Sequence, residues 1–281
     1  NSADGTIEIC KQMDDSNWMP SGPPNGPQRA SVIEGGGNGP DGGSPYNGTP
    51  FYFSINGGTP IEVDAGACSP AIAVPAGTAT VQEESTPNFN LEGFTAVGPD
   101  GSSRLVSGTN PITVNVPFGG VGNETLVTAT NKVQTAQVKV CKELDTAVPA
   151  GKTFHFDATF ELGNGDWEGD YPLSLKPTGD GPSGEVCTNL SMPVPVIDGQ
   201  GDPTTITVTE CDSPFGYTDD GADIVEPTSI TYAGNGSVVE GSPTVYQPGD
   251  SKDLDGSYNI QANLGQGVNE ITFLNSFVVD P

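Results

Sequence analysis

Short runs in which apolar and polar residues alternate dominate this sequence, and the pattern predicts β-strands. Side chains of a strand alternate between its two faces, so each run marks one buried and one exposed face. Gly occurs 39 times and Pro 26 times, mostly between the runs, which is typical of an all-β protein with many turns. In the first half the expected strands are Thr6–Lys11, Phe51–Ile55, Ile61–Asp64, Ala71–Val74, Thr78–Glu83, Ile112–Val116 and Thr125–Asn131.

The second half repeats the order of the first, which predicts two domains, over residues 1–134 and 135–281. The seven strands of the first half are enough for a β-sandwich, and the second half follows the same order. The expected fold class is therefore all-β, with two tandem immunoglobulin-like β-sandwich domains. The second set of strands is Gln137–Lys142, Thr153–Leu162, Tyr171–Lys176, Met192–Ile197, Thr205–Glu210, Ile230–Tyr232, Tyr258–Gln261 and Glu270–Asn275.

Each half places three polar residues on the inward side of its strands. The first strand ends on a lysine, a middle strand on a glutamate and the last strand on an asparagine. Such residues are seldom buried without a compensating interaction. A covalent amide between lysine and asparagine would supply one, and a buried Lys–Glu ion pair beside a hydrogen-bonded asparagine is the alternative. The residues are Lys11, Glu83 and Asn131 in the first half and Lys142, Glu210 and Asn275 in the second.

The segment Thr207–Tyr217 reads TVTECDSPFGY and resembles the Glu-x-x-x-Pro-x-Gly-Tyr signature of CnaB-type (prealbumin-like) domains of bacterial surface proteins and pilins. The strands that end at Lys142 and Asn275 resemble the first and last strands of the same family. The resemblance implies CnaB-like β-sandwiches. It also implies an intramolecular isopeptide bond between these two residues, assisted by Glu210.

In the first half, Lys11, Asn131 and Glu83 occupy the matching positions, but the Pro-x-Gly-Tyr tail is missing. An isopeptide bond requires a neutral lysine, and burial can lower a lysine pKa by up to about 3–5 units. A protonated glutamate in the same apolar site can polarise the asparagine carbonyl and relay protons to the departing ammonia. Adjacent strands hold the reacting atoms together.

Four of the five cysteines are expected to form disulfides within the chain. None lies in a Cys-x-x-Cys pair, so zinc is not expected. Cys10 and Cys141 precede the two lysines and should face outward, and the repeat equates Cys68 with Cys187, which predicts Cys10–Cys68 and Cys141–Cys187. Disulfides indicate an oxidising compartment outside the cytoplasm. Cys211 has no counterpart in the first half, so it is either free or paired with another chain.

The net charge of −27, with only nine Lys and Arg residues, excludes non-specific nucleic-acid binding. No stretch approaches the roughly 20 apolar residues needed to span a bilayer. A first residue that is Asn rather than Met fits an export signal that has been removed. We therefore expect a secreted protein in an extracellular or cell-surface location.

No enzyme, metal or cofactor is expected, apart from the self-cross-linking roles of Glu83 and Glu210. His155 is the only histidine and should face solvent, which leaves no Ser–His or Cys–His hydrolase. The run Asn164–Asp170 has calcium-loop spacing but lacks the distal glutamate of an EF-hand. Four Asn-x-Ser/Thr sequons are candidate glycosylation sites: Asn47, Asn123, Asn189 and Asn235.

The predicted function is that of an extracellular structural protein, the subunit of a surface filament or pilus. Its partners would be copies of itself in a head-to-tail polymer, with the apolar tail Phe277–Val279 added as a strand to a neighbour. The alternative for this tail is that it folds back on its own domain. The alternative is a monomeric cell-surface adhesin or carbohydrate-binding module. The long loop Asp14–Gly48, or Trp18 and Trp167, would then contact a glycan or host-surface ligand.

Overall fold

The structure is a computed structural model that describes residues 4–14, 44–144, 154–161, 169–175, 185–191, 193–211, 224–240 and 258–278. In these residues all regular structure is β, apart from one 3-10 turn, η1 (Gly120–Asn123), which confirms the all-β prediction. The same residues contain no helix that is long and apolar enough to cross a membrane. The chain divides into two compact units between Gln134 and Thr135.

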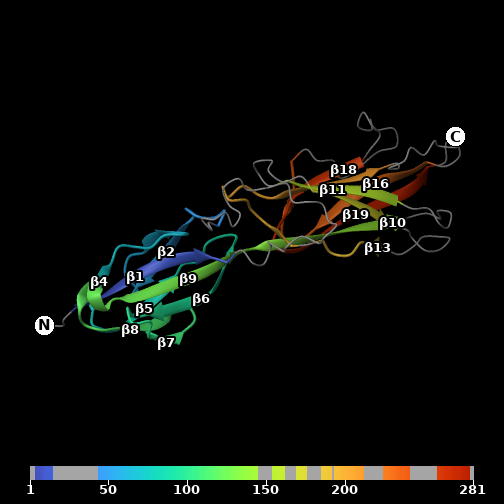
Figure 1. The fold of residues 1–281 in the computed structure, drawn as a ribbon. Helices are drawn as coiled ribbons and strands as arrows, with labels where there is room; N and C mark the ends of the chain where they lie inside the picture. The colour runs from blue at the N-terminus through green and yellow to red at the C-terminus, as the bar shows by residue number, and fades with distance from the viewer. Residues whose placement is uncertain are drawn as a thin grey trace. The chain divides into compact units, whose positions relative to one another are not determined.

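In its described residues, unit 1 contains nine strands: β1 (Asp4–Met13), β2 (Pro50–Ile55), β3 (Ile61–Asp64), β4 (Ile72–Pro75), β5 (Gly77–Glu83), β6 (Phe89–Val97), β7 (Leu105–Gly108), β8 (Ile112–Val116) and β9 (Thr125–Val133). One sheet has the order β4-β1-β9-β6 and the other β3-β2-β5-β8-β7. The first and last strands, β1 and β9, run parallel, while the other neighbours are antiparallel (Figure 1).

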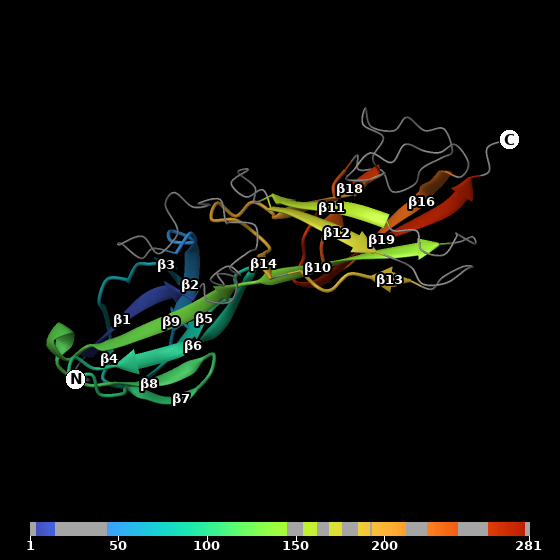
Figure 2. The ribbon, with the colours of Figure 1, turned by 45° about the vertical axis from the view of Figure 1, so that its right-hand side comes forward.

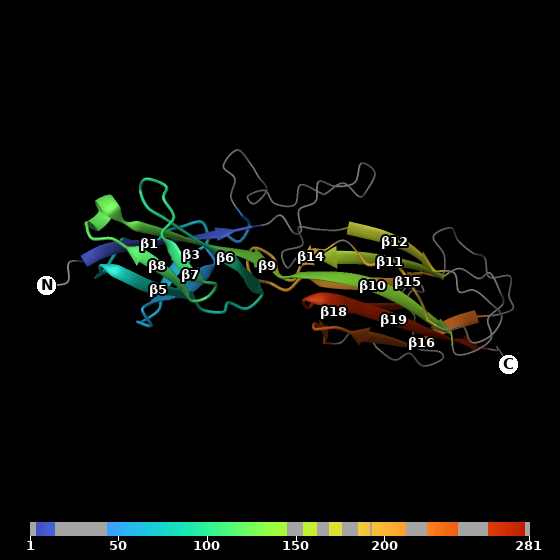
Figure 3. The same ribbon diagram turned by 90° about the horizontal axis from the view of Figure 1, so that it is seen from below.

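Unit 2 contains the following strands in its described residues: β10 (Thr135–Leu144), β11 (Phe154–Glu161), β12 (Gly169–Leu175), β13 (Val186–Cys187), β14 (Val194–Pro195), β15 (Thr205–Cys211), β16 (Ile224–Ala233), β17 (Ser237–Val238), β18 (Tyr258–Asn263) and β19 (Gly267–Val278). One sheet has the order β13-β10-β19-β16, with β14 also paired to β10, and the other β12-β11-β15-β18-β17 (Figure 2). Figure 3 shows β19 between β10 and β16, with β10 and β19 parallel as in unit 1.

Burial alternates along the strands as the sequence pattern requires. In β9 every second residue from Thr125 to Val133 is buried, and the residues between are half-buried. One of the buried positions is Asn131, which therefore shares a face with core residues such as Val127 and Ala129. The alternation that directs apolar side chains into the core thus also directs Asn131 into it.

The expectation of about seven strands in the first half was too low, because β6 and β7 were missed. A register shift between Leu91 and Gly93 interrupts the alternation of β6, which lies at the edge of its sheet. All four residues of β7 are exposed, so this strand has no buried face to reveal it. Edge strands with weak patterns are the elements that periodicity detects least well.

The expected free C-terminal tail was wrong for Phe277 and Val278. These residues belong to β19 and pair with Val225 and Ile224 of β16 in their own unit. Their main chain is therefore part of the unit 2 sheet, and Val279 lies outside the described residues.

Candidate isopeptide-forming sites

Unit 1 brings its predicted lysine, glutamate and asparagine together in the interior. Lys11 comes from β1 and Asn131 from the neighbouring β9, while Glu83 ends β5 in the opposite sheet. Their exposed fractions are only 1%, 2% and 3%, respectively. The cluster therefore lies between the two sheets and joins them.

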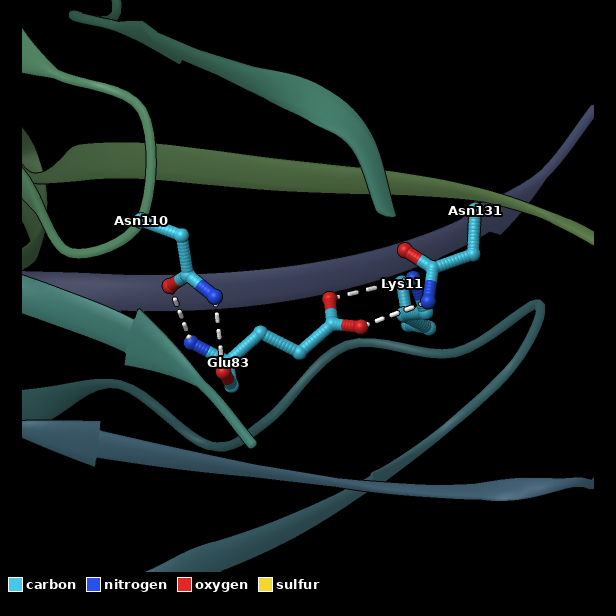
Figure 4. A network of polar contacts seen from close by, with 4 residues as sticks. All are labelled: Lys11, Glu83, Asn110 and Asn131. Atoms are coloured by element: carbon cyan, nitrogen blue, oxygen red, sulfur yellow. Dashed lines mark hydrogen bonds and ion pairs between the residues drawn. The ribbon is translucent and has the colours of Figure 1, made fainter. Parts of the chain in front are cut away.

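The carboxylate of Glu83 bridges the other two side chains (Figure 4). Its Oε2 lies 3.3 Å from the Nζ of Lys11, and its Oε1 accepts a hydrogen bond of 2.6 Å from the Nδ2 of Asn131. The Oδ1 of Asn131 is buried and has no hydrogen-bond partner among the described residues. Rotation of the amide would exchange its nitrogen and oxygen, and would then present the carbonyl to a protonated glutamate.

Burial alters the acidity of Lys11. Its Nζ lies 4.3 Å from the centre of the Phe51 ring. Loss of hydration lowers the pKa of Lys11 to about 8, although the charge and hydrogen bond of Glu83 act in the opposite direction. A fraction of the lysine is thus neutral near physiological pH, which is the form that can act as a nucleophile.

Unit 2 holds the equivalent lysine–glutamate pair. The Nζ of Lys142, which is fully buried in β10, lies 2.8 Å from both carboxylate oxygens of Glu210 in β15. The same Nζ lies 4.4 Å from the centre of the Phe154 ring. Desolvation again lowers the pKa of the lysine to about 8, against the effect of Glu210.

The backbone places Asn275 at the position that Asn131 occupies in unit 1. Lys11 is opposite Ala129, two residues before Asn131. Lys142 is opposite Phe273, two residues before Asn275. The parallel register of first and last strands is therefore the same in both units, although the side chain of Asn275 lies outside the described residues.

Asn110 is a polar contact of this cluster that the sequence analysis missed. Its side chain forms two hydrogen bonds with the main chain of Glu83 (Figure 4). Its position in the sequence could have indicated this role. Asn110 stands two residues before the strand Ile112–Val116, and the intervening Pro111 cannot donate a main-chain hydrogen bond.

Both disulfides form as the repeat predicts, Cys10–Cys68 and Cys141–Cys187. Cys10 and Cys141 are shielded from solvent on their side of the strands, because Cys10 is only 9% exposed and Cys141 is fully buried. The segment that carries Cys68 covers the edge of β1, where the N–H of Lys11 donates to the carbonyl oxygen of Ala67. Each disulfide thus fixes the strand of a candidate reactive lysine.

The cysteines also account for the two possible metal-ligand groups in the described residues, which are Glu8 with Cys10 and Cys68, and Glu185 with Cys141 and Cys187. Disulfide sulfurs are not thiolate ligands, so neither group retains three donors. The side chain of Cys211 lies outside the described residues. Its expected state stays a prediction, but Cys141 and Cys187 are already bonded to each other.

The four sequons differ in exposure. Asn47, Asn189 and Asn235 are exposed, although the Nδ2 of Asn235 donates to the carbonyl of Gln266. Asn123 is half-buried, and its amide is held between Arg104 and the carbonyl of Phe118. Several other candidates lie outside the described residues: most of the loop Asp14–Gly48, Trp18, Trp167, residues 164–168 and the side chain of His155.

Neither a protein-family model nor a curated protein sequence matches this chain. Solved structures do align with it, and the three described here are 12% identical to it. The TIE protein of Bacillus anthracis is 12% identical, with 98% of this chain and 34% of that chain covered and a TM-score of 0.41. The present chain therefore spans about a third of that protein.

Two further solved structures are the major pilin T-13 of Streptococcus pyogenes and an adhesin of Mobiluncus mulieris. The pilin is 12% identical, with full coverage of both chains and a TM-score of 0.38. The adhesin, described as containing intramolecular disulfide, isopeptide and ester bond cross-links, is 12% identical, with 78% and 67% covered and a TM-score of 0.28. Fold and site define this chain as an all-β protein with a buried lysine–glutamate pair and a disulfide in each unit.

Proposed function

We propose that this chain is an extracellular structural protein, a subunit of a surface filament or pilus, in which each domain closes an internal isopeptide bond. The bonds would join Lys11 to Asn131 and Lys142 to Asn275. The observation that carries the proposal is the buried cluster of unit 1, in which one carboxylate contacts both reactants. An ion pair alone needs no asparagine on the same carboxylate.

The reaction we propose is an amide exchange. The neutral Nζ of Lys11 attacks Cγ of Asn131, the Nζ–Cγ bond forms, and the Cγ–Nδ2 bond breaks. Glu83, in its protonated form, hydrogen-bonds the carbonyl oxygen, and it passes a proton from the lysine amine to the departing ammonia. Atoms balance as one amide and one ammonia, and no cofactor takes part. Glu210 has the same role for Lys142 and Asn275.

The proposed bonds suit a protein that bears tension. Each would tie the first strand of a unit to its last strand, and the last strand of unit 1 leads through Gln134 directly into β10. A pull along the chain would then pass through the cross-links and leave the intervening strands folded. The two disulfides favour an extracellular or cell-surface location, since such bonds persist in oxidising compartments.

Intact-mass spectrometry of the native protein tests the bonds. After reduction of the disulfides, the expected mass is lower than that of the sequence by two molecules of ammonia, one for each unit. Lys11→Ala and Lys142→Ala should each restore one ammonia. A native mass equal to that of the sequence would refute the proposal.

Electron microscopy of material shed from the native cell tests the filament. Head-to-tail polymers of this chain are the expected result. Monomers that bind in a glycan array would favour the adhesin instead, and would leave the proposed bonds intact as stabilising features of a binding protein.

A further inference from the structure

Glu83 stands where the pairing of β5 with β8 runs out, while on its other side it pairs with Phe53 of β2. Strand β8 begins at Ile112, which pairs with Val81 of β5. Continuation of this antiparallel register by two residues would set Asn110 opposite Glu83, but the pairing of β5 with β8 stops before that point. The intervening Pro111 has no N–H to donate. Without another partner, the main chain of Glu83 would have only water on that side.

The side chain of Asn110 takes the place of the missing strand residue. Its Oδ1 accepts a hydrogen bond of 3.0 Å from the N–H of Glu83, and its Nδ2 donates one of 2.9 Å to the carbonyl oxygen of Glu83. Figure 4 shows the two bonds side by side, with the carboxylate of Glu83 directed away from them toward Lys11 and Asn131. One amide thus reproduces the pair of bonds that two strand residues would exchange.

In unit 2 the corresponding glutamate is held by main-chain pairing instead of a side chain. Glu210 of β15 pairs with Tyr258 of β18, two residues before the pair of Val208 with Ile260. Tyr258 therefore has the register position of Asn110, and β18 simply begins earlier than β8 does. Both units fix the main chain of the glutamate at the same place, by different means.

We propose that Asn110 is the positioning residue of unit 1, which holds Glu83 so that its carboxyl group reaches Lys11 and Asn131 together. In unit 2 the main chain of Tyr258 has that role. The inference rests on the proposed isopeptide chemistry and deepens it. Asn110 touches none of the reacting atoms; the bonds that form and break are those of Lys11 and Asn131. Asn110 would affect the rate of bond formation through Glu83, because a displacement of a catalytic group by 1 Å can lower a reaction rate by about a hundredfold.

The exposure of Asn110 makes the inference testable. The residue is exposed to solvent, so its truncation opens no cavity in the core. The strands that carry Lys11 and Asn131 do not depend on it, because β1 and β9 pair with each other over seven residue pairs. Asn110→Ala should therefore leave unit 1 folded while the carboxyl group of Glu83 loses its fixed position.

The experiment follows bond formation after cell-free synthesis of the full chain. Proteolysis and mass spectrometry of timed samples quantify the linked peptides of Lys11–Asn131 and of Lys142–Asn275, so that unit 2 is an internal clock in every sample. Asn110→Ala should slow the unit 1 bond by about tenfold or more and leave the unit 2 bond unchanged. Asn110→Asp, which keeps the acceptor but not the donor, should give an intermediate rate.

Asn56→Gly is the matched control. The Oδ1 of Asn56 also accepts a hydrogen bond from β5, from the N–H of Thr80 at 2.8 Å, and its φ of 52° suits glycine. This variant should form the unit 1 bond at the parental rate. Unfolding of both variants in a Lys11→Ala background, where no bond forms, compares their purely structural costs.

The outcomes separate the two proposals. A parental chain that forms neither bond refutes the proposed function itself. If the parental bonds form, an unchanged unit 1 rate in Asn110→Ala overturns the positioning role. Equal slowing in Asn56→Gly overturns it as well, because a general loss of β5 contacts would then suffice. Should Asn110→Ala fail to fold, a parental rate in Asn110→Asp has the same consequence.

Discussion

Units 1 and 2 share their strand order and the register of their first and last strands, yet they hold the lysine–glutamate pair differently. In unit 1 the carboxylate is divided between Lys11, at 3.3 Å, and Asn131. In unit 2 both oxygens lie 2.8 Å from Lys142. The backbone frame is thus common to the two sites, while the distances between lysine and glutamate are not.

The surroundings of the lysines differ in a related way. The residue opposite Lys11 is the small Ala129, whereas the residue opposite Lys142 is Phe273, whose ring lies 5.1 Å from that of Phe156. Even so, burial lowers the pKa of both lysines to about 8. Desolvation is the main cause in both units, so a lowered lysine pKa is common to the two sites although the neighbouring side chains differ.

The largest test of the comparison is loss of the bonds. Lys11→Ala and Lys142→Ala should each destabilise their own unit by about 5 kcal/mol, the value for a cross-link that closes a loop of roughly 100 residues. Calorimetry with intact-mass measurement on the same samples checks this. If only one variant regains an ammonia, the two sites are not equivalent and the shared register does not decide the chemistry.

The disulfides should rank next. Cys10→Ser with Cys68→Ser, and Cys141→Ser with Cys187→Ser, open loops with sequence separations of 58 and 46 residues. The chain-entropy relation gives about 4 kcal/mol for each, so the two units should lose nearly equal stability. Chemical denaturation of the paired variants measures both. A loss in one unit more than twice that in the other would show that the covered strand edges differ in strength.

Much of this arrangement was predictable because it depends on alternation. The inward positions of Lys11, Glu83 and Asn131 follow from the apolar residues two and four places away on the same strands, and the all-β fold follows from the same pattern. The disulfide pairing followed from the repeat, since Cys10 and Cys141 hold the same place before a lysine.

What escaped prediction lacks a periodic signal. Strand β6 has a bulge near Gly93, β7 has no buried face, and Asn110 acts from a turn through its side chain. Its role depends on where β5 and β8 end relative to each other, which only the register reveals. The pairing of Phe277 and Val278 with β16 was not predicted, because a free tail was expected there.

A smaller effect concerns pH in chains that cannot form the bonds. In Asn131→Ala and Asn275→Ala the lysines stay free, with a pKa of about 8 in the folded unit against 10.5 when unfolded. Below pH 8 both states carry the proton, so stability does not change. Between pH 8 and 10.5 only the unfolded chain keeps it, so stability should rise with pH, by at most about 3 kcal/mol.

Denaturation of these two variants across pH 7 to about 9.5 measures the first part of this rise, below the range in which most exposed lysines lose their charge. Similar rises in both units would support equal desolvation of the two lysines. A rise confined to the Asn275→Ala variant would mean that Phe273 matters and that the small Ala129 leaves Lys11 hydrated.

The smallest expected difference lies at the covered edges of β1 and β10. The Oγ of Ser69 accepts a hydrogen bond of 3.0 Å from the N–H of Ile9, and the Oγ1 of Thr188 accepts one of 3.1 Å from Val140. Ser69 is buried and Thr188 half-buried, so water can replace the second hydroxyl more easily than the first. Ser69→Ala should therefore cost about 1–3 kcal/mol and Thr188→Val about 1 kcal/mol or less. Hydrogen exchange of the Ile9 and Val140 amides, measured with thermal unfolding, resolves the two effects. Faster exchange at Val140 than at Ile9 in the respective variants would reverse the ranking of the two edges.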